Sequence, residues 1–165
     1  MSIALLIIDM QKAFKNVEKC RESIDDALEY INETSNIFRN AGKPVIIIQD
    51  EEVSEGPGSD DYDLMEDLIV EDSDYRISKF YSNAFWKTDL EKILRDLDVE
   101  FVVISGFAAE HCVLFTYNGA LERGIGASLL QHGIAGFDKN QIKETQNLRA
   151  VISIEAIDYL LRKLT

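Results

Sequence analysis

Short apolar runs alternate along the chain with segments whose apolar residues recur at helical spacing. Residues 3–8 (IALLII), 45–49 (VIIIQ) and 101–105 (FVVIS) are apolar almost throughout, which is typical of strands covered on both faces. Residues 126–131 (GASLLQ) and a short stretch near 150–154 predict two further strands. Such strands are found in parallel sheets, so we expect a mostly parallel sheet of about five to six strands.

Helices are predicted between these strands from the spacing of their apolar side chains. The first is expected to start at a capping box formed by Ser23 and Asp26 and to end before Gly42. The others are expected after Thr88, around Cys112, over 139–149 and from about Ala156 onward. Alternation of this kind predicts an α/β fold, a three-layer α/β/α arrangement with a doubly wound sheet. We expect residues 1–165 to form a single domain.

The segment from Asp50 to Asp74 interrupts this alternation, because it is acidic and carries Gly56, Pro57 and Gly58. A long irregular segment in a compact domain is often a binding loop or a lid. It is also explained as a solvated loop without a role. Its position after a strand matters, because ligands in α/β sheets bind beyond the carboxyl ends of the strands.

Composition and charge narrow the range of partners. The formal net charge of -13 repels phosphate backbones and anionic membranes, so we expect neither nucleic acid nor a membrane as a partner. The first residues, MSIALLIIDMQ, lack a basic segment and reach Asp9 after one short apolar run, which favours a buried strand over a signal peptide. No apolar run approaches the roughly 20 residues of a membrane helix. Two cysteines are too few for a disulfide framework, and we expect a cytoplasmic protein.

Residues 104–124, ISGFAAEHCVLFTYNGALERG, contain a candidate nucleophile. An apolar strand leads to Gly106, and a predicted helix carries Cys112 in its first turn, where the positive field of the helix N-terminus favours the reactive thiolate. A cysteine hydrolase also needs a proton carrier and a group that stabilises negative charge. Asp9, at the end of the first strand, and Lys79, in YRISKFYSNAF, are the candidates.

The chain resembles the isochorismatase-like cysteine hydrolase family in three segments that occur in the family's order: IALLIIDMQKAF, ISKFYSNAFWKTDLEKILRDLDVEFVVISGF and GFAAEHCVLFTYNGALERG. The resemblance spans residues 3 to about 131. It implies a catalytic triad of Asp9, Lys79 and Cys112, in which the cysteine attacks a carbonyl carbon, commonly that of an amide. The aspartate takes the thiol proton and passes it to the leaving group, and water then releases the acid.

The same resemblance implies further features around the nucleophile. An oxyanion hole is expected from the backbone N–H groups of Ala108 and Cys112, and a cis peptide bond is expected between Phe107 and Ala108. The family's fold is the doubly wound sheet that the apolar pattern predicts. Family members are commonly dimers or tetramers, so a homodimer or homotetramer acting on a small-molecule substrate is implied.

Two features of the sequence depart from the family's pattern. Several amidases of the family bind a divalent metal through an Asp and histidines after the second strand, whereas this chain has QDEEVSEGPGSDDYD there and its only histidines are His111 and His132. We therefore expect no metal and no other cofactor, although carboxylates can hold a hard cation. Ala109 stands where members often have Thr, and His132 stands where the family usually has Asp.

Other residues near the motifs are candidates for the wall of the substrate pocket. They are Gln11 and Phe14 after the first strand, Phe85 and Trp86 after the lysine motif, and Phe107 beside the expected oxyanion hole. Aromatic side chains line ligand sites but also fill cores, so both interpretations stay open.

The sequence thus predicts a metal-independent cysteine hydrolase that cleaves a small amide or related C–N compound through a thioester on Cys112. A dyad of Cys112 with His111 is a weaker model, because adjacent residues on a helix do not face each other. Cys20 is expected to be inert, since nothing near it in the sequence would activate it. A nicotinamidase with a non-standard metal site and a non-catalytic binding protein also stay open, and a flavodoxin-like carrier is the least favoured interpretation.

Overall fold

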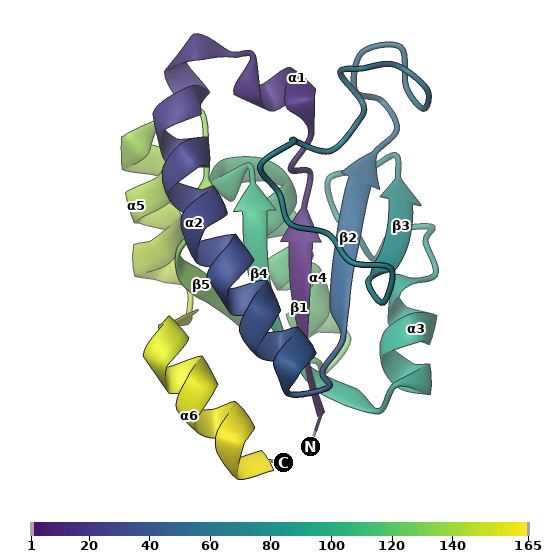
Figure 1. The fold of residues 1–165 in the computed structure, drawn as a ribbon, viewed down its shortest axis with the longest axis vertical. Helices are drawn as coiled ribbons and strands as arrows, with labels where there is room; N and C mark the ends of the chain where they lie inside the picture. Colours follow the sequence, from purple (N-terminus) through teal and green to yellow (C-terminus); the bar gives the residue numbers. More distant parts are fainter. Residues whose placement is uncertain (1, 165) are drawn as a thin grey trace.

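A parallel β-sheet forms the middle layer of the molecule, whose structure, a computed structural model, describes residues 2–164 (Figure 1). Within these residues, six strands lie in the order β3-β2-β1-β4-β5-β6, and all neighbouring pairs are parallel. They are β1 (Ser2–Ile8), β2 (Val45–Asp50), β3 (Tyr75–Lys79), β4 (Val99–Phe107), β5 (Gly126–Ala135) and β6 (Val151–Ile152). The first strand, β1, lies in the middle of the sheet; β2 and β3 are added on one side of it, and β4, β5 and β6 on the other. The predicted doubly wound α/β fold is therefore confirmed.

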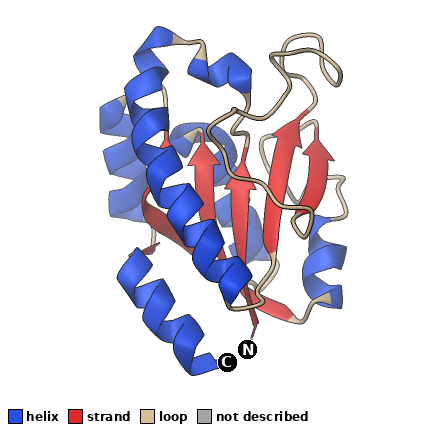
Figure 2. Ribbon diagram, in the orientation of Figure 1, coloured by secondary structure: helices blue, strands red, loops and turns tan. Residues whose placement is uncertain are grey.

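Helices cover both faces of this sheet (Figure 2). Alternate side chains of β1 enter two separate cores: Leu5 and Ile7 pack on the side of α2 and α6, and Leu6 and Ile8 pack on the side of α3 and α4. The helices are α1 (Lys12–Lys15), α2 (Glu18–Asn40), α3 (Leu90–Asp96), α4 (Leu114–Glu122), α5 (Lys139–Leu148) and α6 (Ile154–Leu164). Among residues 2–164, no helix has both the length and the apolar character needed to cross a membrane.

Helix α2 follows the apolar pattern but begins earlier than the sequence predicts. Its predicted apolar face is buried, but its first residue is Glu18, so the capping box expected at Ser23 is wrong. The hydroxyl group of Ser23 instead donates to the carbonyl oxygens of Cys20 and Gly136, at 3.0 and 3.2 Å. Since Cys20 is itself fully buried, packing of the first turn extends the helix upstream.

Strand β3 is an edge strand that the apolar pattern does not predict. Of its five residues only Ile77 and Lys79 are buried, so it lacks the uniformly apolar run of an inner strand. Its pairing with β2 is regular, and the register sets Asp50 beside Lys79. The edge of the sheet therefore carries a buried lysine at its carboxyl end.

The acidic loop over residues 51–74 connects β2 to β3 and crosses the face of the sheet that α2 covers (Figure 1). Met65 and Leu68 of this loop are buried in the same core as the α2 side chains. Arg39 of α2 holds the end of the loop, because its guanidinium group donates to both carboxylate oxygens of Asp74 at 2.9 and 2.8 Å. The loop is thus fixed at its end, immediately before β3 begins.

The carboxyl ends of β1 and β4 approach each other closely at Gly106. Its φ of +108° lies in the region that favours glycine, and a Cβ atom there would lie 2.1 Å from the carbonyl oxygen of Ile8. Only glycine therefore fits beside Ile8, the residue that precedes Asp9.

Candidate active site

Four neighbouring strands of the sheet each contribute a reactive side chain at their carboxyl ends. Asp9 follows β1, Asp50 ends β2, Lys79 ends β3, and Cys112 lies in the turn after β4. Because the strand order is β3-β2-β1-β4, residues that are far apart in the sequence come together at one edge. The structure thus groups the three predicted catalytic residues, Asp9, Lys79 and Cys112, and adds Asp50.

The Lys79 ammonium group lies at the centre of this cluster. Its Nζ is 2.9 Å from Asp9 Oδ2, donates to Asp50 Oδ2 at 2.9 Å, and donates to Cys112 Sγ at 3.4 Å. Burial lowers the pKa of Lys79, but the negative charge of Asp9 and the other acceptors around the ammonium group raise it more, so the pKa lies above its usual range. The lysine is therefore a permanent cation between two carboxylates and a thiol.

The Asp9 carboxyl group is buried, and its contact with a positive charge is not supplemented by hydrogen bonds from the described residues. Its backbone is left-handed, with a φ of 50°, and its side chain is 1% exposed. The contact with Lys79 is an ion pair that falls short of good hydrogen-bond geometry, and neither carboxylate oxygen has a described hydrogen-bond partner. Burial raises the pKa of Asp9 to about 6 against the opposing effect of Lys79. At neutral pH it is a carboxylate able to accept a proton.

The Cys112 thiol differs from the sequence-based prediction. Cys112 lies in a single π-helical turn, Ala109–Val113, that precedes α4, instead of in the first turn of the α-helix. Burial, and then the charge of Asp9, raise the pKa of its thiol to about 12, although Lys79 opposes them. The expected thiolate is therefore wrong for the resting site. A neutral thiol faces a carboxylate base, which is a suitable pairing for general-base activation.

The backbone before Cys112 has the predicted unusual geometry. The peptide bond between Phe107 and Ala108 is cis, as the family resemblance implies. The N–H groups of His111 and Val113 both donate to the carbonyl oxygen of Ala108, at 2.9 and 3.1 Å. The N–H group of Cys112, which lies between them, takes no part in this pair of bonds. The oxyanion hole expected from Ala108 and Cys112 stays a prediction.

Asp50 is the residue of the site that the sequence analysis did not assign. Its place after the second apolar strand is the same signal that singles out Asp9 after the first. Glu51 and Glu52 follow it, and the sequence does not show which of these carboxylates faces inward. The register of β2 with β3 decides this, because it pairs Asp50 with Lys79.

Gln11, predicted to line the pocket, is fully buried and hydrogen-bonded to the backbone. Its side-chain nitrogen donates to the carbonyl oxygens of Asp50 and Tyr62 at 3.1 and 2.9 Å, and its side-chain oxygen accepts from the N–H of Asp50 at 2.8 Å. The structure therefore favours a positioning role for Gln11 over direct contact with substrate.

The predicted aromatic residues of the pocket lie in different surroundings. The rings of Phe14 and Phe107 are 4.5 Å apart, and Phe137, which the sequence analysis did not name, packs edge-on against Phe107 at 4.8 Å. Phe85 is buried in the core beneath α3 and α4, whereas Trp86 is 52% exposed. Phe85 and Phe107 are both core residues, at 4% and 2% exposed, and Phe14 packs against Phe107 at the edge of the core on the α2 side.

Comparison with known proteins places this chain in a family. A family model described as an isochorismatase domain matches residues 3–155. The chain belongs to the isochorismatase family. The uncharacterized isochorismatase family protein YrdC of Bacillus subtilis is 28% identical over 148 residues, which make up 86% of this chain and 78% of that protein.

Solved structures share the fold of this isochorismatase family member. An isochorismatase-like hydrolase from Alkaliphilus metalliredigens has a TM-score of 0.88 at 19% identity, with 97% of this chain and 99% of that chain covered. N-carbamoylsarcosine amidase from Thermoplasma acidophilum has a TM-score of 0.82 at 22% identity, with 94% and 98% covered. The family and the grouping of Asp9, Lys79 and Cys112 support a cysteine hydrolase.

The side chains around Lys79 do not favour a bound metal ion. Donor atoms of Asp9, Asp50 and Cys112 lie within 4.8 Å of one another, a grouping that resembles a set of metal ligands. However, Lys79 Nζ lies within 3.4 Å of all three side chains and already supplies the positive charge. No histidine joins this group among the described residues.

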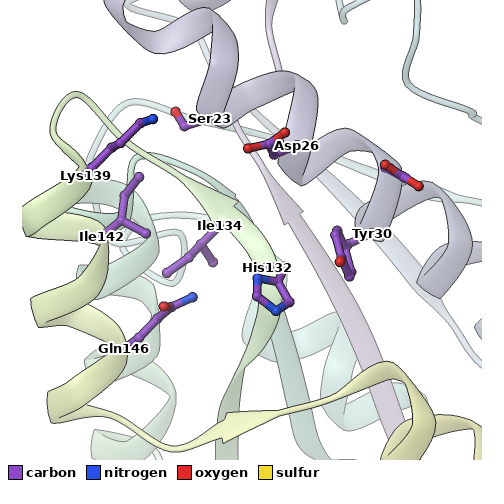
Figure 3. A pocket seen from close by; sticks show the side chains of 9 residues that line it. Ser23, Asp26, Tyr30, His132, Ile134, Lys139, Ile142 and Gln146 are labelled. Atoms are coloured by element: carbon purple, nitrogen blue, oxygen red, sulfur yellow. The ribbon is translucent and has the colours of Figure 1, made fainter.

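The second histidine of this isochorismatase family member lies in a different part of the fold. His132 lines a cavity of about 430 Å³ between α2, β5 and α5, into which Tyr30 and Lys139 also project (Figure 3). The His132 and Tyr30 rings are 4.9 Å apart. None of the residues that line this cavity belongs to the cluster around Lys79. His132 is therefore separate from the candidate active site.

Proposed function

We propose that this protein is a hydrolase that cleaves an amide or related C–N bond of a small molecule through a thioester on Cys112. The observation that carries the proposal is the position of the Lys79 ammonium, which contacts both the Asp9 carboxylate and the Cys112 thiol in a buried site. The three residues then have distinct roles: Cys112 is the nucleophile, Asp9 carries protons, and Lys79 stabilises negative charge.

The first half of the proposed reaction forms the thioester. The Asp9 carboxylate takes the proton of the Cys112 thiol as the sulfur attacks the carbonyl carbon, and the carbonyl oxygen gains the negative charge. The backbone N–H groups of Ala108 and Cys112 stabilise that oxyanion. When the tetrahedral intermediate collapses, the C–N bond breaks, and protonated Asp9 gives its proton to the departing nitrogen.

The second half of the reaction releases the acid. Asp9, again a carboxylate, takes a proton from a water molecule as the water oxygen attacks the thioester carbon. The C–S bond then breaks, and the proton on Asp9 returns to the sulfur. The products are a carboxylic acid and ammonia or an amine, and the enzyme is back in its resting state with a neutral thiol. Neither half requires a metal.

The fold neighbours support C–N cleavage. One of them is named as an amidase of N-carbamoylsarcosine, a small molecule. We infer that the substrate here is likewise a small amide or carbamoyl compound, and that the partly buried Phe14 contacts its apolar part. Trp86, which is exposed, is the second proposed contact.

Intact-protein mass spectrometry after exposure to a panel of metabolite amides tests the proposal. We expect an acyl adduct on the wild-type protein and on Cys20→Ala, in which only the buried second cysteine is removed. The Cys112→Ala variant should carry no adduct and release no amine. If wild type and Cys112→Ala release amine at the same rate, Cys112 is not the nucleophile. An alkylatable thiol without turnover of any amide would instead favour the non-catalytic binding protein.

A further inference from the structure

Asp50 shares the Lys79 ammonium group with Asp9. The parallel register sets Asp50 directly beside Lys79, and Lys79 Nζ is 2.9 Å from one carboxylate oxygen of each aspartate. An ammonium group has three N–H bonds; here it donates to Asp50 and to Cys112, and it lies within ion-pair distance of Asp9. Asp50 therefore fixes the direction of one of these N–H bonds.

Three hydrogen bonds to the backbone and side chain of Asp50 hold this carboxylate in place. The other carboxylate oxygen, Oδ1, accepts a hydrogen bond from the N–H of Glu52 at 2.9 Å. The side chain of Gln11 pairs with both the N–H and the carbonyl group of Asp50, at 2.8 and 3.1 Å. Because Gln11 is two residues from Asp9, the segment that carries the base also sets the position of Asp50.

We propose that Asp50 is a positioning residue that holds Lys79 between Asp9 and Cys112, and that Gln11 holds Asp50 in that position. This inference rests on the proposed function, because it uses the roles that the proposed function assigns to Asp9, Lys79 and Cys112. Asp50 is not a catalytic residue, since it acts through Lys79. Gln11 acts one step further back, through Asp50.

This arrangement has a definite electrostatic consequence for the base. With Asp50 in place, one cation is divided between two carboxylates, and the negative charge of Asp50 adds to burial in raising the pKa of Asp9. Without that charge, Lys79 is attracted by Asp9 alone, and Asp9 becomes a weaker base. Asp50 therefore adds to the basicity of Asp9, of which burial is the main cause.

Carboxyl ¹³C NMR of protein labelled at its aspartates tests the proposal without any substrate. The titration midpoint of Asp9, assigned by its absence in Asp9→Asn, should fall by about one pH unit in Asp50→Asn. Asp50→Glu, which keeps the charge, should bring the midpoint back toward the wild-type value. Gln11→Leu, which is similar in volume but forms no hydrogen bonds, should lower the midpoint in the same direction as Asp50→Asn.

The matched control is Glu55→Gln, which removes one negative charge from an exposed position of the same loop. It should leave the Asp9 midpoint unchanged. An unchanged midpoint in Asp50→Asn, or an equal shift in Glu55→Gln, would overturn the inference. Because the titration needs no turnover, failure of the proposed function would appear separately, as absence of an acyl adduct on wild-type Cys112.

Discussion

The Lys79 ammonium lies 2.9 Å from the Asp9 carboxylate, and both side chains are at most 1% exposed. Such a pair usually lowers the pKa of the acid. Here the cost of burying the carboxylate exceeds the attraction of the lysine, so the pKa of Asp9 is raised to about 6. The pair therefore leaves the aspartate able to gain and lose a proton near neutral pH, as the proposed proton carrier must.

The pH dependence of Cys112 acylation follows from this pKa. With p-nitrophenyl acetate as the acyl donor, the acylation rate constant should rise with pH up to about 6 and level off above it, because only the Asp9 carboxylate accepts the thiol proton. In Asp9→Asn the plateau should fall roughly 10²- to 10⁴-fold and the inflection near pH 6 should vanish. Stopped-flow release of p-nitrophenol measures both. An inflection that survives in Asp9→Asn would assign it to another group.

The stability of Asp9→Asn should depend on pH with an unusual sign. The folded pKa of Asp9, about 6, exceeds its unfolded value of 3.8, so the folded state binds the proton more tightly. Ionisation of Asp9 therefore lowers the free energy of unfolding as pH rises from 3.8 to about 6, and the full cost is present above that range. Asn does not ionise, so the variant should be more stable than wild type at pH 8, by about 2–3 kcal/mol.

Urea denaturation at two pH values measures this difference. At pH 4 the two proteins should unfold at similar urea concentrations, since Asp9 is then largely protonated in the folded state. A variant that is less stable than wild type at pH 8 would show that the ion pair with Lys79 outweighs the burial cost.

The rate of Cys112 alkylation should depend on the thiolate population alone, whereas the rate of acylation also depends on Asp9 as a base. Because burial and Asp9 hold the pKa of the thiol at about 12, iodoacetamide at pH 7 should modify Cys112 more slowly than free glutathione. In Asp9→Asn the thiol loses its negative neighbour and should be alkylated faster than in wild type, although acylation is lost. Peptide mass spectrometry follows the reaction, with fully buried Cys20 as the internal reference. Slower alkylation of Asp9→Asn would contradict the assigned effect of Asp9.

The sequence predicts the inner strands well but not β3, the edge strand that carries Lys79. The runs at residues 3–8 and 101–105 are apolar because both of their faces are buried, so pattern alone identifies β1 and β4. Strand β3 has only Ile77 and Lys79 buried, and a buried lysine does not count as an apolar position. The strand that carries a candidate catalytic residue is thus the one that the apolar pattern misses.

The sequence predicts which residues form most of the candidate site, but it does not predict their charges and pKa values. Motifs identify Asp9, Lys79 and Cys112, whereas the role of Asp50 depends on the pairing of β2 with β3, which no local pattern shows. The thiolate prediction failed because it counted the helix field and the Lys79 cation near Cys112 but not the burial of the thiol or the charge of Asp9. Burial and the distance to Asp9 decide the outcome, and both depend on the tertiary fold.

Substitution of Gly106 should be far more damaging than substitution of another glycine with a similar backbone. In Gly106→Ala the new Cβ would lie 2.1 Å from the Ile8 carbonyl oxygen, so β1 and β4 must separate next to Asp9. We expect a loss of at least about 3 kcal/mol in the free energy of unfolding, with loss of acylation. Gly58→Ala is the matched control, because its φ of +97° is similar and no atom lies within 4 Å. Comparable unfolding midpoints for the two variants would contradict a steric cause.

The buried pair of Arg39 and Asp74 should stabilise the edge strand that carries Lys79. Their side chains are 8% and 1% exposed, and Arg39 also donates to the carbonyl oxygen of Ile69 at 3.0 Å, so removing one partner leaves a buried charge unpaired. Arg39→Met should therefore lower the free energy of unfolding by about 3–5 kcal/mol.

The exposed pair of Lys92 and Asp96 provides the control for this prediction. Lys92→Met should leave the unfolding midpoint nearly unchanged, because water and salt screen exposed pairs. Hydrogen exchange should also distinguish the two variants. Only Arg39→Met should speed exchange of the β3 amides, because Asp74 lies directly before Tyr75, the first residue of that strand. Equal exchange of the β3 amides in Arg39→Met and wild type would mean that the loop end does not hold the strand, and that the pairing with β2 alone places Lys79.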